Sequence, residues 1–211
     1  AHVRPFFENL TSVAAELREA AEPALRIGGS EIVLRDHIPT VMQRVREAHP
    51  KIRLSLHSGH QAQLESWLRD GQIDIAVGPV EARPPARLRQ LRLARTPVVL
   101  LVNRRQPWKT AAEVWEKKRV TVPLIGLPAA TAVMQNFQRD LKRRRIVWPQ
   151  AIEVTSVELV TRYVASGHGC GVNLAIPSVI KHRDVRVLPL EGFEPMTMGV
   201  LWRGDPSPLL R

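Results

Sequence analysis

The sequence predicts an α/β fold of two similar Rossmann-like lobes, and this prediction rests on a duplicated pattern of apolar runs. Three short runs of the kind that form buried strands occur twice along the chain, with helical stretches between them. The first set covers residues 25–29, 52–56 and 73–78, and the second covers residues 120–125, 151–155 and 170–175. Since a strand–helix–strand connection places its strands parallel in one sheet, the pattern predicts two βαβαβ units in tandem.

The first lobe begins with the strand over residues 25–29, after which Ser30 stands where a helix N-cap belongs. Pro39 lies inside the helical pattern that follows, so this helix is either kinked at Pro39 or begins near it. A second helix starts after Gly59 and ends at Gly71. The apolar residues expected on the buried face of the first helix are Ile38, Val41, Met42, Val45 and Ala48.

The second lobe follows a strand pair, and two crossing strands are expected to join the lobes. Residues 88–102 read as two strand pieces that meet at Pro97, where we place the first crossing. Thr110 and Thr131 each precede a helical pattern as N-caps. Residues 185–190 form a further strand, and residues 196–202 are expected to return to the first lobe. The expected ranges are 23–95 and 193–211 for lobe I, and 96–192 for lobe II.

Residues 1–22 are predicted to form a separate helix outside the duplicated body. An apolar stripe recurs along it every three or four residues, through Val3, Phe7, Leu10, Ala14 and Leu17. A helix with so apolar a face needs a partner, so we interpret it as a linker or dimerisation helix that pairs with a second copy.

The composition and the charge argue against several classes of function. The net charge of +11 comes with runs of Arg and Lys, but aromatic residues do not alternate with them and no zinc or RNA-binding motif accompanies them. We interpret the runs as a solvated basic surface; a supporting role beside DNA and the attraction of an anionic ligand stay open.

A single cysteine, Cys170, excludes an internal disulfide and favours a cytoplasmic location. No apolar run reaches the ~20 residues of a membrane span, and the absence of an initiator Met favours a piece of a longer protein.

Several short motifs, in this order and spacing, resemble the effector-binding domain of LysR-type bacterial transcriptional regulators. They are LRIGGS at residues 25–30 with Ile38-Pro39, His49-Pro50, DGQIDIAV at 70–77, VASGHGCGV at 164–172 with Ile176-Pro177, and VLWR at 200–203. The resemblance implies the fold of type II periplasmic binding proteins. It also implies a small-molecule effector in the interlobe cleft and a homodimeric or homotetrameric regulator. Promoter DNA would be bound through an N-terminal winged helix-turn-helix domain upstream of this chain, and residues 1–22 would match the linker helix.

The candidate ligand-binding residues lie at the carboxyl ends of predicted strands, where helix N-termini offer free N–H groups to an anion. On the first lobe they are Ser30, Ile32, His60 and Gln61, and on the second lobe they are Leu127, Pro128, Ala129, Thr131, Ser156 and Val157. We expect an effector with an apolar body and one acidic end. The alternative for each hydroxyl residue is an ordinary helix cap. Ile32 stands where the family often has Ser or Thr.

Enzyme, metal and cofactor chemistry find little support in the sequence. The spacing His57-x-x-His60 lacks a third zinc ligand nearby. The glycine run at residues 167–171 follows a helix and precedes a strand, which reverses the order of a dinucleotide-binding loop. We interpret it as a helix C-cap and Cys170 as a buried structural thiol. We therefore expect no catalytic residues and no cofactor. The predicted function is effector sensing for a transcriptional regulator, and the alternative is a solute-binding receptor of a transport system with the same fold.

Overall fold

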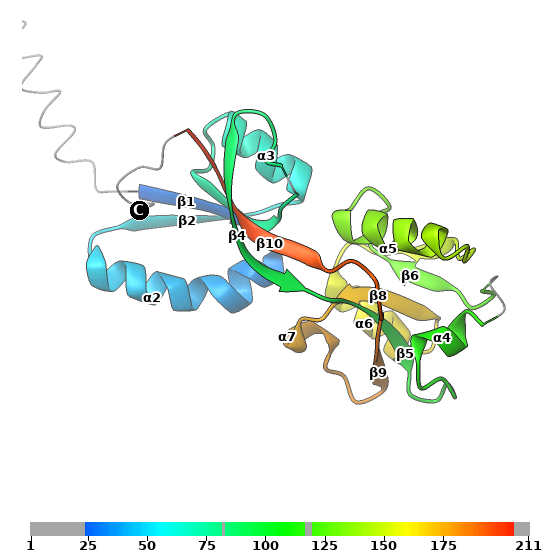
Figure 1. Ribbon diagram of the computed structural model, residues 1–211. Helices are drawn as coiled ribbons and strands as arrows, with labels where there is room; N and C mark the ends of the chain where they lie inside the picture. Colours follow the sequence, from blue (N-terminus) through cyan, green and yellow to red (C-terminus); the bar gives the residue numbers. More distant parts are fainter. Residues whose placement is uncertain (1–23, 82, 117–119, 205–211) are drawn as a thin grey trace, which may run out of the picture. The chain divides into compact units, whose positions relative to one another are not determined.

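The structure, a computed structural model, describes residues 24–81, 83–116 and 120–204 (Figure 1). The predicted linker helix over residues 1–22 lies outside these ranges. The described part divides into two compact units. Unit 1 comprises residues 24–78, Pro84–Gln90 and 200–204, and unit 2 comprises the rest. Two of the divisions fall inside the long strands β4 (Leu88–Thr96) and β10 (Met196–Arg203), so each of these strands contributes residues to both units.

The first sheet has the strand order β2-β1-β3-β10-β4. Strand β1 (Ala24–Gly29) pairs in parallel with β2 (Arg53–Ser58) and with β3 (Ile75–Pro79). Leu25 and Ile27 of β1 pack with the helix after it, whereas a Cβ at Gly28 would meet Leu64 of helix α3 (Gln61–Arg69) on the other face. The absence of a side chain at Gly28 therefore lets α3 lie close to the sheet.

The helix after β1 contains the irregularity that Pro39 predicts. Helical structure starts at Glu31, passes through the π-helical turn η1 (Val33–His37), and continues as α2 (Ile38–Ala48). The Ile38 N–H donates to the Val33 carbonyl, five residues back. A wider turn directly before a proline relieves the clash between the proline ring and the preceding turn. The prediction of a buried face is wrong for Val41, which is 49% exposed, and for Ala48, which is also exposed, because Ile38, Met42 and Val45 fill that face without them.

The second sheet has the order β7-β6-β8-β5-β9 and repeats the first. Its three parallel strands, β6 (Leu124–Gly126), β7 (Gln150–Glu153) and β8 (Cys170–Leu174), match β1, β2 and β3 in chain order and position. Strand β5 (Val98–Asn103) runs antiparallel to β8 and to β9 (Val185–Pro189). The predicted duplication is thus confirmed. Strand β6 begins later than the predicted residue 120, because Pro123 offers no N–H to a ladder.

Two cores cover the two faces of this second sheet. Helix α5 (Ala132–Arg143) packs Phe137, Met134 and Leu141 against one face. Helix α6 (Val157–Ala165) packs Val160 and Val164 against the other. The short helices α4 (Ala111–Val114) and α7 (Pro177–Ile180) complete the unit. Within the described ranges, no helix is both long and apolar enough to span a bilayer.

Glycines end two of the helices as the sequence predicts. After α6, the Gly167 N–H donates to Val164 and the His168 N–H donates to Tyr163, with Gly167 at φ 85°. This pattern is a Schellman motif, and Gly71 with φ 69° ends α3 in the same way. The prediction of a helix C-cap at the glycine run is therefore confirmed, and Cys170 beyond it is buried.

Candidate functional site

The carboxyl ends of β1 and β2 form one candidate edge, in unit 1. These strands pair through Gly29 and Ser58, and the Gly59 N–H donates to the Gly29 carbonyl at 3.1 Å. The helices that begin at Glu31 and Gln61 therefore start side by side. Their first N–H groups have no partners inside the helices, so this edge is suited to an acceptor with negative charge.

Ser30 and Ile32 differ in what they offer a ligand. The Ser30 carbonyl accepts from the Leu34 N–H at 3.0 Å, so Ser30 is the helix N-cap. Its side chain is exposed, and its hydroxyl has no hydrogen-bond partner within the described part of the chain. Ile32 is only 6% exposed. The polar donor at this helix start is thus Ser30, and Ile32 contributes buried apolar surface.

His60 and Gln61 begin the neighbouring helix. His60 is exposed and is the N-cap of α3, but its side chain makes no capping hydrogen bond. The Gln61 amide donates to the Glu65 carboxylate at 3.2 Å, one turn along the same helix. No hydrogen bond from the Ser30, His60 or Gln61 side chains ties one loop of this edge to the other among residues 24–81.

The carboxyl ends of β6 and β7 form the second candidate edge, in unit 2. Residues 127–131 connect β6 to α5, and Val154 after β7 donates to the Gly126 carbonyl at 2.9 Å. Thr131 is the N-cap of α5, yet its hydroxyl donates to the Pro128 carbonyl at 2.8 Å and does not cap the helix N–H groups. Its backbone N–H donates to the same carbonyl at 2.8 Å. The predicted hydroxyl contact at Thr131 is therefore directed into the loop.

Ser156 and Val157 begin α6 beside this loop. The Ser156 hydroxyl accepts from the Leu159 N–H at 3.3 Å, which is an ordinary N-cap. The Val157 carbonyl accepts from the side-chain amide of Asn173 at 3.0 Å. Asn173 lies on β8 and is 1% exposed, so the hydrogen bond from a buried side chain ties the start of α6 to the sheet.

Two residues that brace this edge were absent from the sequence-based prediction. Asn173 interrupts the apolar run of β8, and a polar residue in a buried strand was a usable signal. Gln150 begins β7, and its amide contacts the carbonyls of Gly126 and Leu127 at 3.1 and 3.0 Å. Nothing in the local sequence marks Gln150, because its role depends on the pairing of β6 with β7.

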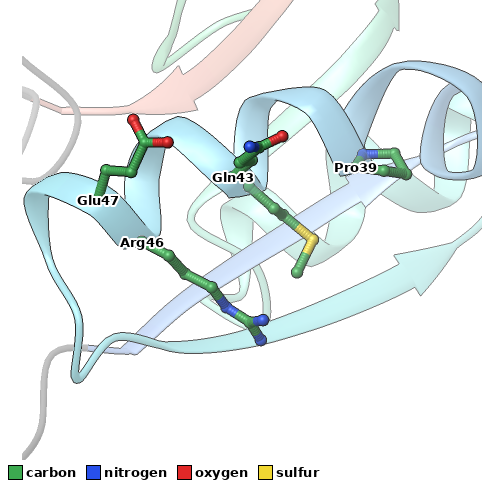
Figure 2. A pocket seen from close by; sticks show the side chains of 5 residues that line it. Pro39, Gln43, Arg46 and Glu47 are labelled. Atoms are coloured by element: carbon green, nitrogen blue, oxygen red, sulfur yellow. The ribbon is translucent and has the colours of Figure 1, made fainter.

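A hollow of about 620 Å³ lies elsewhere, along α2. Its lining residues are Pro39, Met42, Gln43, Arg46 and Glu47, all from that one helix (Figure 2). It contains none of the predicted site residues, and a single helix supplies its walls. The convergence of two helix starts at each strand-end edge is a better basis for a ligand site than this hollow.

Metal and thiol chemistry find no support in the described residues. They contain no group of three His, Cys, Asp or Glu side chains that could hold a metal ion. His57 lies 2.9 Å from the Ser55 hydroxyl and against the edge of Trp67. Burial raises the pKa of the Cys170 thiol to about 12, so Cys170 stays a neutral thiol at physiological pH and is a poor nucleophile.

Residues 18–211 match the family described as the LysR substrate binding domain. This chain belongs to that family. Among curated relatives, the uncharacterized HTH-type transcriptional regulator YfiE of Escherichia coli is 30% identical over 172 residues, covering 78% of this chain and 57% of YfiE. The HTH-type transcriptional regulator BenM of Acinetobacter baylyi is 26% identical over 181 residues, covering 81% and 57%. The chain thus spans little more than half of these relatives.

Solved structures confirm the fold of this LysR-family chain. The BenM effector binding domain with its effector benzoate is 18% identical, has a TM-score of 0.72, and is matched over 90% of this chain and 88% of that one. HinK, a LysR family transcriptional regulator from Pseudomonas aeruginosa, is 17% identical with a TM-score of 0.77, over 100% and 77%. The predicted family and two-lobed fold are confirmed. The family's members are regulators and not enzymes, and no match supports the transport-receptor alternative.

Proposed function

We propose that this chain is the effector-sensing part of a LysR-type transcriptional regulator and that a small anionic ligand binds at a strand-end edge of the kind described in each unit. The observation that carries the proposal is the repeated construction of these edges in a chain of this family. Each edge has two helix N-termini side by side at the ends of parallel strands. N–H groups without intrahelical partners favour a carboxylate, sulfate or phosphate.

The ligand's acidic end would be bound by N–H groups and its body by apolar side chains. Ala129 and Ala130 are exposed, and their N–H groups have no partner within the described ranges. Half-buried Leu127 packs on both cores of unit 2 and gives the loop an apolar wall. This combination favours a small organic acid, and benzoate, the effector of BenM, is a suitable first probe.

A thermal-shift screen of small and aromatic carboxylates tests the ligand class. A ligand at about a hundred times its dissociation constant stabilises the native state by roughly 2.7 kcal/mol, so a true ligand raises the melting temperature measurably. Ser30→Ala should weaken the binding of that acid by roughly 1–3 kcal/mol, because a hydrogen bond to charge is lost. Ser166→Ala, at an exposed serine that ends α6, is the matched control. An effector that binds with equal affinity to the wild type and to Ser30→Ala would contradict the proposed contact.

We also propose that the full-length protein binds promoter DNA through an upstream winged helix-turn-helix domain and acts in the cytoplasm. Support comes from the matched relatives, which are HTH-type regulators of which the matched segment covers only 57%. The chain alone should bind DNA only weakly, without sequence preference, and its affinity should fall steeply as the salt concentration rises.

A homodimer or homotetramer is the proposed assembly. Residues 1–22 would pair through their apolar stripe, and two described helices also present apolar side chains. Val41 on α2 is 49% exposed, and Tyr163 on α6 is 40% exposed. Exposed apolar helix faces favour self-association. Sedimentation of the Val41→Glu/Tyr163→Glu and Phe7→Glu/Leu10→Glu variants should show weaker association. The control is Val147→Glu, at a 60% exposed valine between α5 and β7, which should leave association unchanged. Unchanged sedimentation of both double variants would contradict this assembly.

A further inference from the structure

Three backbone carbonyls surround the amide of Gln150. Its Nε2 atom lies 3.1 Å from the Gly126 oxygen, 3.0 Å from the Leu127 oxygen and 3.3 Å from the Ile152 oxygen. A side-chain amide has one donor end and one acceptor end, and only the donor end is compatible with three carbonyls. Gln150 therefore shares its two N–H groups among these carbonyls, and those of Gly126 and Leu127 lie where β6 passes into the loop over residues 127–131.

A β-bulge aims Gln150 at this loop. In the register between β6 and β7, Leu124 lies opposite Gln150 and Ile125 lies opposite Ile152. Ala151 is thus an extra residue in β7. A bulge turns the side chains beside it away from the regular alternation of a strand, and bulges are frequent beside functional sites. The same irregularity explains why neither alternation nor spacing in the sequence reveals Gln150.

Further hydrogen bonds within unit 2 also bind the carbonyls at the start of this loop. The Gly126 carbonyl also accepts from the Val154 N–H, and the Pro128 carbonyl accepts from both the hydroxyl and the N–H of Thr131. Three successive carbonyls, from Gly126 to Pro128, are thus bound to donors within unit 2. In a trans peptide the N–H points opposite to the carbonyl of the same unit, so the Ala129 N–H is directed away from Thr131.

Gly126, the first of these three residues, also has little free space around its Cα atom. A Cβ at Gly126 would lie 2.6 Å from the Met134 sulfur and 3.6 Å from Gln150 Nε2. Met134 belongs to α5 and is 1% exposed, so the helix, the loop and Gln150 pack around one glycine. The loop conformation is therefore set by contacts from three elements.

We propose that Gln150 is a positioning residue of the effector site. By binding the Gly126 and Leu127 carbonyls, it fixes the start of the loop. From that fixed start, the hydrogen bonds of Thr131 to the Pro128 carbonyl direct the Ala129 N–H toward the acidic end of the ligand. Gln150 itself does not contact the ligand. This inference rests on the proposed function, because it assumes that the 127–131 loop receives the effector.

The test measures anion binding at the two alanine amides by NMR, with inorganic sulfate as the probe. Sulfate remains an anion between pH 5 and pH 7.5. In the wild type, sulfate should shift the Ala129 and Ala130 amide resonances with saturation. Gln150→Leu keeps a similar volume without the donor and should bind sulfate about tenfold more weakly. Gln138→Leu is the matched control, because the Gln138 amide also donates to backbone, to the Trp148 carbonyl, which does not belong to the loop.

Gln150→Glu separates positioning from general stability. At pH 7.5 the carboxylate has no donor and faces carbonyl oxygens, so sulfate binding should fall as in Gln150→Leu. At pH 5 a larger fraction of the side chain is protonated, which restores a donor, and affinity should recover in part. The sulfate affinity of the wild type is measured at both pH values, and its change is subtracted because it reports every other titrating group. A purely structural role would change thermal unfolding without this recovery of affinity.

The outcomes distinguish the two proposals. If sulfate and benzoate leave the Ala129 and Ala130 resonances of the wild type unchanged, the proposed effector site is wrong. If the wild type binds sulfate there and Gln150→Leu binds it equally well, the role of Gln150 is overturned while the effector site stands.

Discussion

The strand-end edges of the two units are built from equivalent elements but are held in different ways. In unit 2, side chains of Gln150, Thr131 and Asn173 bind backbone carbonyls around the helix starts, and Ser156 caps α6. In unit 1, the Ser30 hydroxyl has no partner among the described residues, and the His60 side chain caps nothing.

The strong side-chain contacts of unit 1 lie at the opposite end of its sheet. Arg26, near the start of β1, donates to the Asp74 carboxylate just before β3 through two side-chain hydrogen bonds and its backbone N–H, and its carbonyl accepts from the Asp74 N–H. Arg26 also donates to the Gly71 carbonyl at 2.6 Å. Unit 2 has a comparable amino-end contact, from the Trp148 indole N–H to the Val122 carbonyl at 2.7 Å. Unit 2 also has side-chain hydrogen bonds to the backbone at the carboxyl ends of its strands, whereas the Ser30 and His60 side chains make none among the described residues of unit 1. A preorganised edge lowers the entropic cost of binding, so unit 2 should set specificity and unit 1 should adapt to the ligand.

The largest expected effect concerns the support of the rigid edge. Phe137 on α5 is 1% exposed and stacks on Phe193 at 5.6 Å between ring centroids. Phe137→Ala should lower the free energy of unfolding by about 3–5 kcal/mol, because it removes apolar contacts and leaves a cavity. Leu91→Ala, at a 56% exposed leucine, should cost under about 0.5 kcal/mol. Urea denaturation measures both, and a loss below about 1 kcal/mol for Phe137→Ala would contradict the importance of this core.

Two serines at helix starts test the comparison directly. Ser156→Ala should destabilise the protein by about 1 kcal/mol, because the Leu159 N–H loses its cap. Ser30→Ala should change the free energy of unfolding by only a few tenths of a kcal/mol, since its hydroxyl has no partner in the described chain. Equal losses in urea denaturation would show that the two helix starts are held alike.

The amino-end contact of unit 1 should depend on pH. Burial raises the pKa of Asp74, but hydrogen bonds from the Arg26 side chain and backbone, and its charge, outweigh burial and lower that pKa. A carboxyl with a lowered pKa contributes stability above its ordinary pKa and loses it as pH falls through the folded-state value. Asp74→Asn should therefore cost about 1 kcal/mol at neutral pH, and the difference from the wild type should shrink in acid. A difference that is constant with pH in denaturation curves would refute this assignment.

The smallest expected effect is at the end of α5, away from the ligand edge. Arg145 has φ 59°, and the N–H groups of Arg145 and Ile146 complete a Schellman motif of the kind that Gly71 and Gly167 complete elsewhere. Glycine adopts this conformation at lower cost, so Arg145→Gly should raise stability by about 0.5 kcal/mol. Ligand affinity should stay unchanged. Destabilisation in thermal unfolding would mean that the Arg145 side chain makes a larger contribution than its backbone strain.

Much of the fold could be predicted from the sequence, because apolar runs and helix ends are local signals. The duplicated order of β1–β3 and β6–β8, the proline effect at Pro39 and the helix end at Gly167 were all predictable from neighbouring residues. The exposed position of Val41 was not, since a π-helical turn and competing side chains decide which face is buried.

The candidate site was less predictable than the fold. In the sequence, Ser30 and Ser156 each precede a helical pattern and are interpreted alike as helix caps. In the structure, only the Ser156 hydroxyl accepts from a helix N–H group. Thr131 also reads as a cap, but its hydroxyl turns back to Pro128. The role of Gln150 arises from a bulge between two strands far apart in sequence, and no local pattern encodes it.

The most direct test of the central claim is the backbone mobility of the two edges in the free protein. NMR order parameters report motion on the picosecond-to-nanosecond timescale, with values near 0.85 for a rigid backbone. We predict values near 0.85 for residues 127–131 and 156–159, and clearly lower values for residues 30–33 and 59–63. Order parameters that are equal at the two edges, or lower at the edge of unit 2, would contradict the claim that unit 2 is preorganised for the effector and unit 1 adapts to it.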